Sequence, residues 1–428
     1  MKTKTLFAGI VLLAIASFLF LKPQPAKVAP DHCVFNNLFG IVDLDPEFKH
    51  APTEAIESAI RDGLDWLEKA QHPDGGWGAG FNAYQKEMDP HKVPADPATT
   101  AMVSMALLRT GSTLEEGPHQ KQLKKATEYL LNAVEDAIPN GAKITDLTGT
   151  QIQSKLGQNI DLVLTTQYLT NLLDELDNNS SMYKRVFNSV NKSVDMVQTS
   201  QDDSGRTKGA GWAGVLQSSF ATSALEAAQA RGAYVDGVKL TAAKSYQKSN
   251  YDPVTESVEV KDGAGIMLYS VSSSVRSSAK EARRAKKLAK KAQEAAGVLD
   301  EVVVVNYENL RKAGVEEEDA IQLETAYKVY ESAKVKAQEK RVVSGFGNNG
   351  GEEFLSFLQT GESMVIANDN TWKNWYDSMS ANLLNIQNND GSWNGHHCIT
   401  SPVFCTATCL LILSINNDID QLVAQGEE

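Results

Sequence analysis

The pattern Gln-x-x-Asp-Gly-x-Trp occurs near both ends of this chain and constrains its fold more than any other feature. The first copy spans 71–77 and the second spans 387–393. Asp-Gly supplies a tight bend, and a tryptophan is a large apolar anchor that can hold such a bend against a core. The expected anchors of this repeat are Gln71, Asp74, Trp77, Gln387, Asp390 and Trp393.

Each copy lies between two predicted helices. Apolar residues at spacings of three and four precede the second copy and mark an amphipathic helix: Trp372, Trp375, Met379, Leu383 and Ile386. Ser401-Pro402 follows the second copy, and Asp96-Pro97 follows the first. Both pairs suit an N-cap and a first helical residue. A looser copy is expected between Gln198 and Trp212. Repetition at this scale predicts an all-α architecture of stacked helical pairs.

The motif resembles the Gln-Trp repeat of squalene–hopene cyclases and of protein prenyltransferase β subunits. The resemblance covers roughly Thr53–Gly263 and Val342–Asn417. It implies an α/α toroid, in which a ring of inner helices lies inside a ring of outer helices. The central cavity of that fold holds isoprenoids in those families. We therefore expect a toroid in two parts, 52–270 and 342–428.

The N-terminus predicts a membrane segment. Lys2 and Lys4 precede an uncharged, mostly apolar run, Thr5–Leu21. Its length is near the lower limit for a membrane span and long for the core of a signal peptide. We expect an uncleaved anchor helix at 1–22 and a tether at 23–51, with a secreted form after cleavage as the alternative. In either case the basic N-terminus stays inside and the bulk of the chain is exported.

Composition excludes some partners. The formal net charge is −13, which argues against nucleic acid, because phosphate binding needs a basic surface. A hydrophobic content of 42% is sufficient for a core. The chain has 4 cysteines, too few for a disulfide scaffold, although an exported protein can contain one or two disulfides.

The range 271–341 does not follow the repeat. Basic residues form one helical stripe in its first part: Arg276, Lys280, Arg283, Lys287 and Lys291. Alanines occupy most of the opposite positions, and the acidic run 316–319 follows. The simplest interpretation is a solvated, inserted helical hairpin with its basic arm against its acidic arm. We expect it to protrude as a spacer or a partner-binding arm that contributes few core residues.

The expected starts of the inner helices are Asp96, Asp161, Ser218 and Ser401. Parallel helices would sum their dipoles to a positive rim that suits an anion such as a diphosphate. The cyclases use an Asp-x-Asp-Asp-Thr acid, and the nearest match here is 95–101. Ala98 and Thr99 replace its central carboxylates. Asp96 suits an N-cap, so protonation-initiated cyclisation has no visible acid.

The prenyltransferases hold zinc with an Asp-x-Cys pair on one inner helix and a histidine on the last one. Glu352 or Glu353 would occupy the place of the aspartate, and Cys405 that of the histidine. Carboxylate, histidine and cysteine all bind Zn²⁺, so the resemblance implies a zinc site at Glu352, His397 and Cys405. We expect one Glu–His or Cys–His pair within ~6 Å. The full candidate polar site is Glu352, Glu353, His396, His397, Cys398 and Cys405.

Other interpretations remain open. Cys398 and Cys405 can form a disulfide, or Cys405 and Cys409 can be small apolar residues of a crowded helix. No catalytic residue is assigned. The chain is either a transferase or cyclase that binds an isoprenoid or another lipid-like ligand, or a protein-interaction module at the cell surface. A carbohydrate-active toroid is a third option, but its candidates, the Asp and Trp of each repeat, fit turn anchoring better.

Overall fold

The computed structural model describes residues 48–138, 141–297, 302–347 and 349–426, which are mostly helical. Within these ranges the strands are β1 (Tyr251–Asp252) and β2 (Ser257–Val258), which form one short antiparallel pair. The prediction of an all-α chain is therefore confirmed.

The predicted anchor (1–22) and nearly all of the predicted tether (23–51) lie outside the described residues. Among the helices that the structure describes, none is by itself both long and apolar enough for a membrane span. A bent pair, Pro402–Leu413 with Ile415–Gln425, reaches that length and composition only when its two members are taken together. Membrane attachment therefore stays a prediction from the N-terminal sequence.

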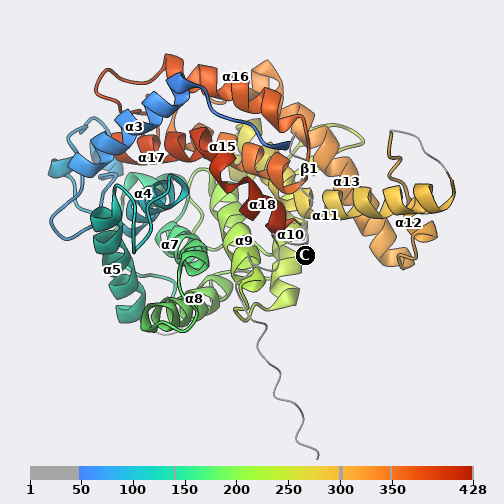
Figure 1. The fold of residues 1–428 in the computed structure, drawn as a ribbon, viewed down its shortest axis with the longest axis horizontal. Helices are drawn as coiled ribbons and strands as arrows, with labels where there is room; N and C mark the ends of the chain where they lie inside the picture. Colours follow the sequence, from blue (N-terminus) through green and yellow to red (C-terminus); the bar gives the residue numbers. More distant parts are fainter. Residues whose placement is uncertain (1–47, 139–140, 298–301, 348, 427–428) are drawn as a thin grey trace, which may run out of the picture.

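Helices that are largely buried, α11 (Met267–Ala295) only over its first part, form a closed circuit of packed elements at the centre of the molecule (Figure 1). Each packs on the next, and the last packs on the first. In the first of them every residue from Pro97 to Leu107 is buried, as expected for a helix without a polar face. In chain order they are α4 (Pro97–Arg109), α7 (Ile160–Leu172), α9 (Gly214–Ala230), α11 (Met267–Ala295), α15 (Gly351–Ile366) and α17 (Pro402–Leu413).

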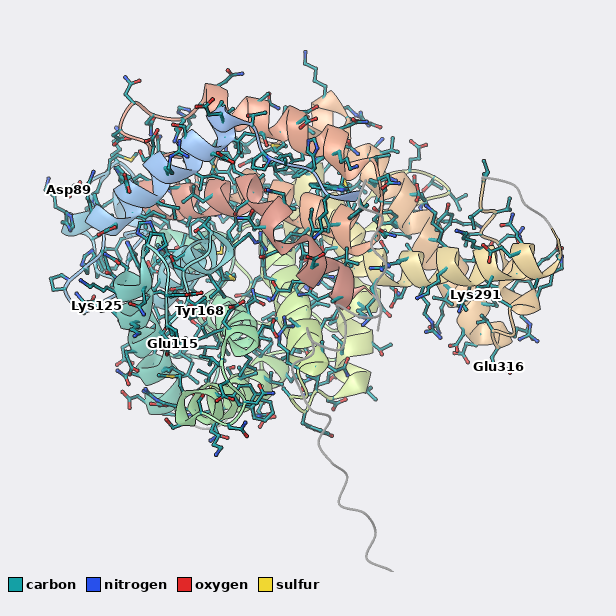
Figure 2. All side chains as sticks on the ribbon, in the orientation of Figure 1. Asp89, Glu115, Lys125, Tyr168, Lys291 and Glu316 are labelled. Carbon is teal, nitrogen blue, oxygen red and sulfur yellow. The ribbon has the colours of Figure 1, made fainter. Side chains whose placement is uncertain are left out.

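Amphipathic helices alternate with these along the chain and cover them from outside. The first buries Ile56, Leu64 and Leu67 and leaves its charged residues in solvent. Tyr168 of α7 and Thr127 of the neighbouring outer helix share a buried 2.6 Å hydrogen bond between their hydroxyls; Figure 2 labels Tyr168. The outer helices are α3 (Glu54–Lys69), α5 (Gln120–Asp136), α8 (Ser181–Thr199), α10 (Gly237–Lys248), α13 (Glu317–Gln338) and α16 (Trp372–Asn385).

Short elements connect these helices or follow the last of them. They are η2 (Asn82–Tyr84), η3 (Pro90–Lys92), α6 (Gln151–Lys155), η4 (Leu173–Glu175), η5 (Lys261–Gly263), α12 (Tyr307–Lys312), α14 (Lys340–Val343), η6 (Ile415–Asp418) and α18 (Ile419–Gln425). The last of them, α18, appears within the inner circuit in Figure 1.

The two copies of the repeat motif have the same structure. Trp77 is 0% exposed, its indole N–H donates to the carbonyl of Leu67 at 2.8 Å, and its backbone N–H donates to Thr100 Oγ1 at 2.9 Å. Trp393, also 0% exposed, makes the corresponding bonds to Leu383 and Thr406 at 2.9 and 2.8 Å. Each tryptophan therefore joins the end of an outer helix to the next inner helix.

The glutamine and aspartate of the motif hold the turn itself. The Gln71 amide donates to the carbonyls of Gly75 and Gln122, and the Gln387 amide donates to those of Gly391 and Ala59. The aspartate accepts from the backbone N–H two residues later in both copies, at 3.0 Å for Asp74 and 3.1 Å for Asp390. These carboxylates act in turn formation, as predicted.

The predicted middle copy needs a correction. Trp212 is 62% exposed and is no core anchor. Instead, the backbone N–H of Thr207 donates to Ser218 Oγ at 3.0 Å, the bond that Trp77 makes to Thr100. Ser218 consequently lies inside α9 rather than at its start, whereas Asp96 and Ser401 are N-caps as predicted. The middle copy has no tryptophan at the anchor position, where Thr207 stands instead, so the prediction of Trp212 as the anchor was wrong.

The predicted arm 271–341 also differs from expectation. The ends of α11 and α13 that lie nearest the circuit belong to the main core, with Val275, Ala279, Tyr330 and Ala337 buried. The expectation that this range contributes few core residues is therefore wrong. Only the distal part protrudes (Figure 1). It has a small core of its own: Ala285, Ala289, Val305, Leu310, Val315, Ala320 and Leu323.

The basic stripe of α11 is not a solvated face at its first positions. Arg276 is 7% exposed and forms a 2.9 Å ion pair with Glu226. Arg283 is 7% exposed and donates to the carbonyls of Ile366 and Val423. Lys291, further along, lies on the protruding part (Figure 2) and is exposed. The stripe thus changes from buried to solvated as α11 leaves the inner circuit.

Candidate functional site

The start of α15 packs directly on the loop before α17. The backbone N–H of Gly351 donates to the carbonyl of Ile399 at 3.0 Å. A Cβ at Gly395 would lie 2.1 Å from that same carbonyl oxygen, so only glycine fits there. This close approach brings Glu352 and Glu353 beside the loop that carries His396, His397 and Cys398.

Glu353 acts mainly as a helix cap. It is 1% exposed and accepts from the backbone N–H of Gly350 at 3.0 Å and of Phe346 at 3.2 Å. Tyr269 Oη donates to Glu353 at 2.7 Å, and burial together with this carboxylate raises the tyrosine pKa. The expected Glu–His pair is present, with His397 Nε2 3.8 Å from Glu353 Oε2.

Glu352 is a buried carboxyl whose protonation is strongly changed by the fold. It is 2% exposed and accepts from the backbone N–H of Ile399 at 3.3 Å. Burial, followed by repulsion from Glu353, raises its pKa to about 8, although Lys155 acts in the opposite direction. Glu352 is therefore mostly protonated at neutral pH.

The described cysteines Cys398, Cys405 and Cys409 are free thiols, so the predicted alternative of a Cys398–Cys405 disulfide is wrong. Burial and the neighbouring Glu352 raise the pKa of Cys398 to about 12 and that of Cys405 well above its usual value. The Cys405 thiol donates to the Ile399 carbonyl at 3.6 Å. Neutral thiols are poor nucleophiles.

The two histidines of the loop differ in their burial and contacts. His397 is half-buried and its ring lies 4.9 Å from that of Phe346, whereas His396 is exposed and bonds through its backbone N–H to Asn349. Among the residues that the structure describes, no group of three or more His, Cys, Asp or Glu is arranged to hold a metal ion. Glu353 already accepts three hydrogen bonds, from Tyr269, Phe346 and Gly350. This arrangement does not fit the zinc site that the resemblance implied.

Another buried carboxylate pair was not recognised as a pair from the sequence. Asp96 caps α4 and accepts from Thr99 and Ala79, and Asp161 in the first turn of α7 accepts from the backbone N–H of Ala98 at 3.1 Å. Burial and their mutual repulsion raise the pKa of Asp96, and burial raises that of Asp161. The sequence signal was an acid at the start of each of two consecutive inner helices, as the N-cap of α4 and in the first turn of α7.

Asp161 also contributes to a surface cavity of about 260 Å³. Polar side chains of the α6–α7 region, including Gln153 and Ser154, line it together with the loops 142–149 and 209–211. Gln153 is already bonded to Asp161 and to the Leu147 carbonyl. Glu352 and Glu353 do not line this cavity.

The axis of the inner circuit contains a much smaller cavity, of about 50 Å³. Every helix of the circuit contributes to its wall, and so does α18. Arg109 lies beside it and forms ion pairs with Glu362 at 2.6 Å and with Asp418 at 2.5 Å. This cavity is thus small, and buried charges lie at its wall.

Comparison with known proteins finds a match between part of this chain and one family model. Residues 34–145 match the family model described as the squalene-hopene cyclase C-terminal domain, whereas searches of curated proteins and of solved structures found no match. The matched range contains the first repeat motif, 71–77, and α4 with its cap Asp96. Over this part of the chain, the resemblance to the prenyltransferase and squalene cyclase-like family is confirmed.

Proposed function

We propose that this chain is a binding module held at the cell surface by its N-terminus, built on an α/α toroid of the kind found in cyclases and prenyltransferases. The alternation of inner and outer helices along the chain and the closed circuit of inner helices support that architecture. The match to the squalene-hopene cyclase C-terminal domain supports it independently.

The observation that carries the proposal is the size of the axial cavity. Binding sites for small molecules typically have volumes of roughly 300–1,000 Å³, whereas this cavity measures about 50 Å³. This small volume supports a chain that does not enclose an isoprenoid at this position. A module that binds a partner through its outer surface does not need that space.

The buried carboxylates support the same conclusion, because their oxygens already serve the fold. Asp96 and Glu353 cap α4 and α15, and Asp161 binds the backbone of α4. Glu352 is mostly protonated but lines neither cavity described above. A general acid must reach the substrate atom that it protonates.

The distal arm is the part of the surface that we assign to partner binding. It protrudes from the circuit and has a separate small core. Its surface carries charged side chains, and both Lys291 on α11 and Glu316 before α13 are exposed (Figure 2). An exported, anchored toroid would present this arm away from its own core.

The test has two parts, both with the full chain in detergent or membranes. Farnesyl diphosphate and squalene should show neither saturable binding nor conversion. A photo-crosslinking residue at Lys291 or Glu316 should form one discrete adduct in native membranes. The same residue at Lys125 on α5, which is exposed on the body of the molecule, should form none. Binding of one isoprenoid per chain, or equal crosslinking from all positions, would contradict the proposal.

A second candidate is an isoprenoid or lipid-like ligand inside the ring. Apolar side chains of several inner helices surround the axis, including Met102, Phe220 and Leu358. Such a ligand needs more space than the described cavity contains, so it requires an element at the axis to move.

A further inference from the structure

The C-terminal helix α18 lies where a ligand of the ring would enter. Its residues Gln421, Leu422 and Gln425 line the axial cavity together with side chains from every helix of the inner circuit. On the inner helices the contributing residues include Arg109 and Ile366, the last residues of α4 and α15. Therefore α18 closes the ring at the C-terminal ends of its inner helices.

Polar contacts account for much of what holds α18 in place. Asp418, just before it, pairs with Arg109 at 2.5 Å, and the Gln421 amide donates to Asp174 at 2.7 Å. Arg283 of α11 donates to the carbonyl of Val423 at 2.6 Å. The Arg109 and Asp418 side chains are only 7% and 18% exposed, so the cost of removing both charges from water offsets much of their attraction in the closed state.

The apolar contacts of α18 are few. Its buried apolar residues are Ile419, Leu422 and Val423, and its next residue, Gly426, lies against the carbonyl of Ile366, where a Cβ would approach within 2.3 Å. A helix this short is not stable on its own. It is therefore ordered by its contacts with the ring.

The cavity beneath α18 is lined by polar side-chain atoms that have no hydrogen-bond partner. Gln359 of α15 is 1% exposed, and neither its amide nitrogen nor its amide oxygen has a hydrogen-bond partner. Gln167 Oε1 of α7, which lines the same cavity, is also unpartnered. Buried polar groups almost always have partners. The cavity of about 50 Å³ has room for roughly three to five waters, at about 10–15 Å³ each, and therefore for water or a ligand group that could bond to these amides.

We propose that α18 is an intramolecular plug, and that its displacement opens the ring interior to an apolar chain with an uncharged polar head. The apolar walls would contact the chain, and the amides of Gln359 and Gln167 would bind the head. An uncharged head is favoured because Arg109 retains Glu362 as its partner when Asp418 leaves, and Arg276 retains Glu226. The plug goes beyond the surface-binding role proposed above and does not depend on it.

The experiment compares the full chain with a chain that ends at Asn417. The probe is N-phenyl-1-naphthylamine, whose fluorescence rises in apolar sites, and farnesol is the competitor. The full chain should bind the probe weakly. The truncated chain should bind one probe per chain at least tenfold more tightly, and farnesol should displace it. A truncated chain that melts cooperatively but binds no more probe than the full chain would overturn the plug.

A second variant decides the question if truncation prevents folding. Asp418→Asn combined with Gln421→Ala in the full chain removes the polar contacts and retains the apolar ones. It should bind the probe at least threefold more tightly than the full chain. Asp420→Asn is the matched control, because Asp420 pairs with Lys49, whose side chain is 57% exposed. Equal probe binding by the double variant and this control would also overturn the proposal.

Discussion

Trp393→Ala tests the structural role of the repeat motif most directly. Trp393 is fully buried, and its ring lies where a Cβ on Gly63 of α3 would approach within 3.0 Å. Its indole N–H donates to the Leu383 carbonyl at the end of α16. A buried tryptophan covers roughly 150–250 Å², worth about 4–6 kcal/mol at 25 cal/mol per Å².

The expected loss of unfolding free energy is smaller than this upper value, because the surroundings relax around the cavity. Truncations of buried large aromatics cost about 3–5 kcal/mol, and we expect that range for Trp393→Ala. Trp393→Phe should have an intermediate effect. It keeps most of the apolar contact but leaves the Leu383 carbonyl without its donor, at a cost of roughly 1–3 kcal/mol.

Equilibrium urea unfolding, followed by far-UV circular dichroism, measures these differences as a shift of the midpoint at unchanged slope. Trp212→Ala is the matched control, because this tryptophan is 62% exposed and its removal should change stability by no more than about 0.5 kcal/mol. If Trp393→Ala and Trp212→Ala were equally stable, the tryptophan of the motif would not anchor the turn.

Other predictions concern the buried charges, the arm and the thiols. Glu352 has a folded-state pKa raised to about 8 from 4.5. The free energy of unfolding should therefore fall as pH rises between these values, by up to ~1.4 kcal/mol per pH unit. Glu352→Gln should remove this fall, as measured by urea unfolding at a series of pH values. Arg109→Met should cost about 3–5 kcal/mol in the same assay, because it leaves buried carboxylates unpaired. Replacing 285–323 by a Gly/Ser linker should preserve cooperative melting, whereas replacing 274–341 should abolish it. In a Cys33→Ser background, a thiol reagent should modify the partly exposed Cys398 only slowly in the native protein, because its pKa is raised to about 12, and the described cysteines of α17 only after unfolding.

The sequence predicted the elements whose chemistry is local. A Gln-x-x-Asp-Gly-x-Trp turn forms its own hydrogen bonds, and the N-caps Asp96 and Ser401 bond within their own helices. The prediction for the middle copy failed because it depended on this local signature. A turn without tryptophan keeps its backbone geometry but loses the residue by which the sequence identifies it. Thr207 could be identified only from its bond to Ser218.

Contacts between distant segments could not be predicted. The basic stripe of α11 predicted a solvated helix, because the sequence around Arg276 and Arg283 does not identify the partners that bury them. Those partners, Glu226 and the carbonyls of Ile366 and Val423, lie on other elements. The closure of the ring by α18 was missed in the same way, since a short polar helix after the last repeat resembles a terminal extension.

The distribution of charge along the inner helices bears on the diphosphate expected from their dipoles. Helix N-termini favour negative charge and C-termini favour positive charge. Here the protein supplies both: Asp96, Asp161 and Glu353 lie at the starts of inner helices, and Arg109 and Arg231 lie at the ends of α4 and α9. Carboxylates that already occupy the N-terminal rim oppose a further anion. The dipoles are therefore neutralised within the fold, and recognition of a diphosphate at that rim would require these carboxylates to be protonated or displaced.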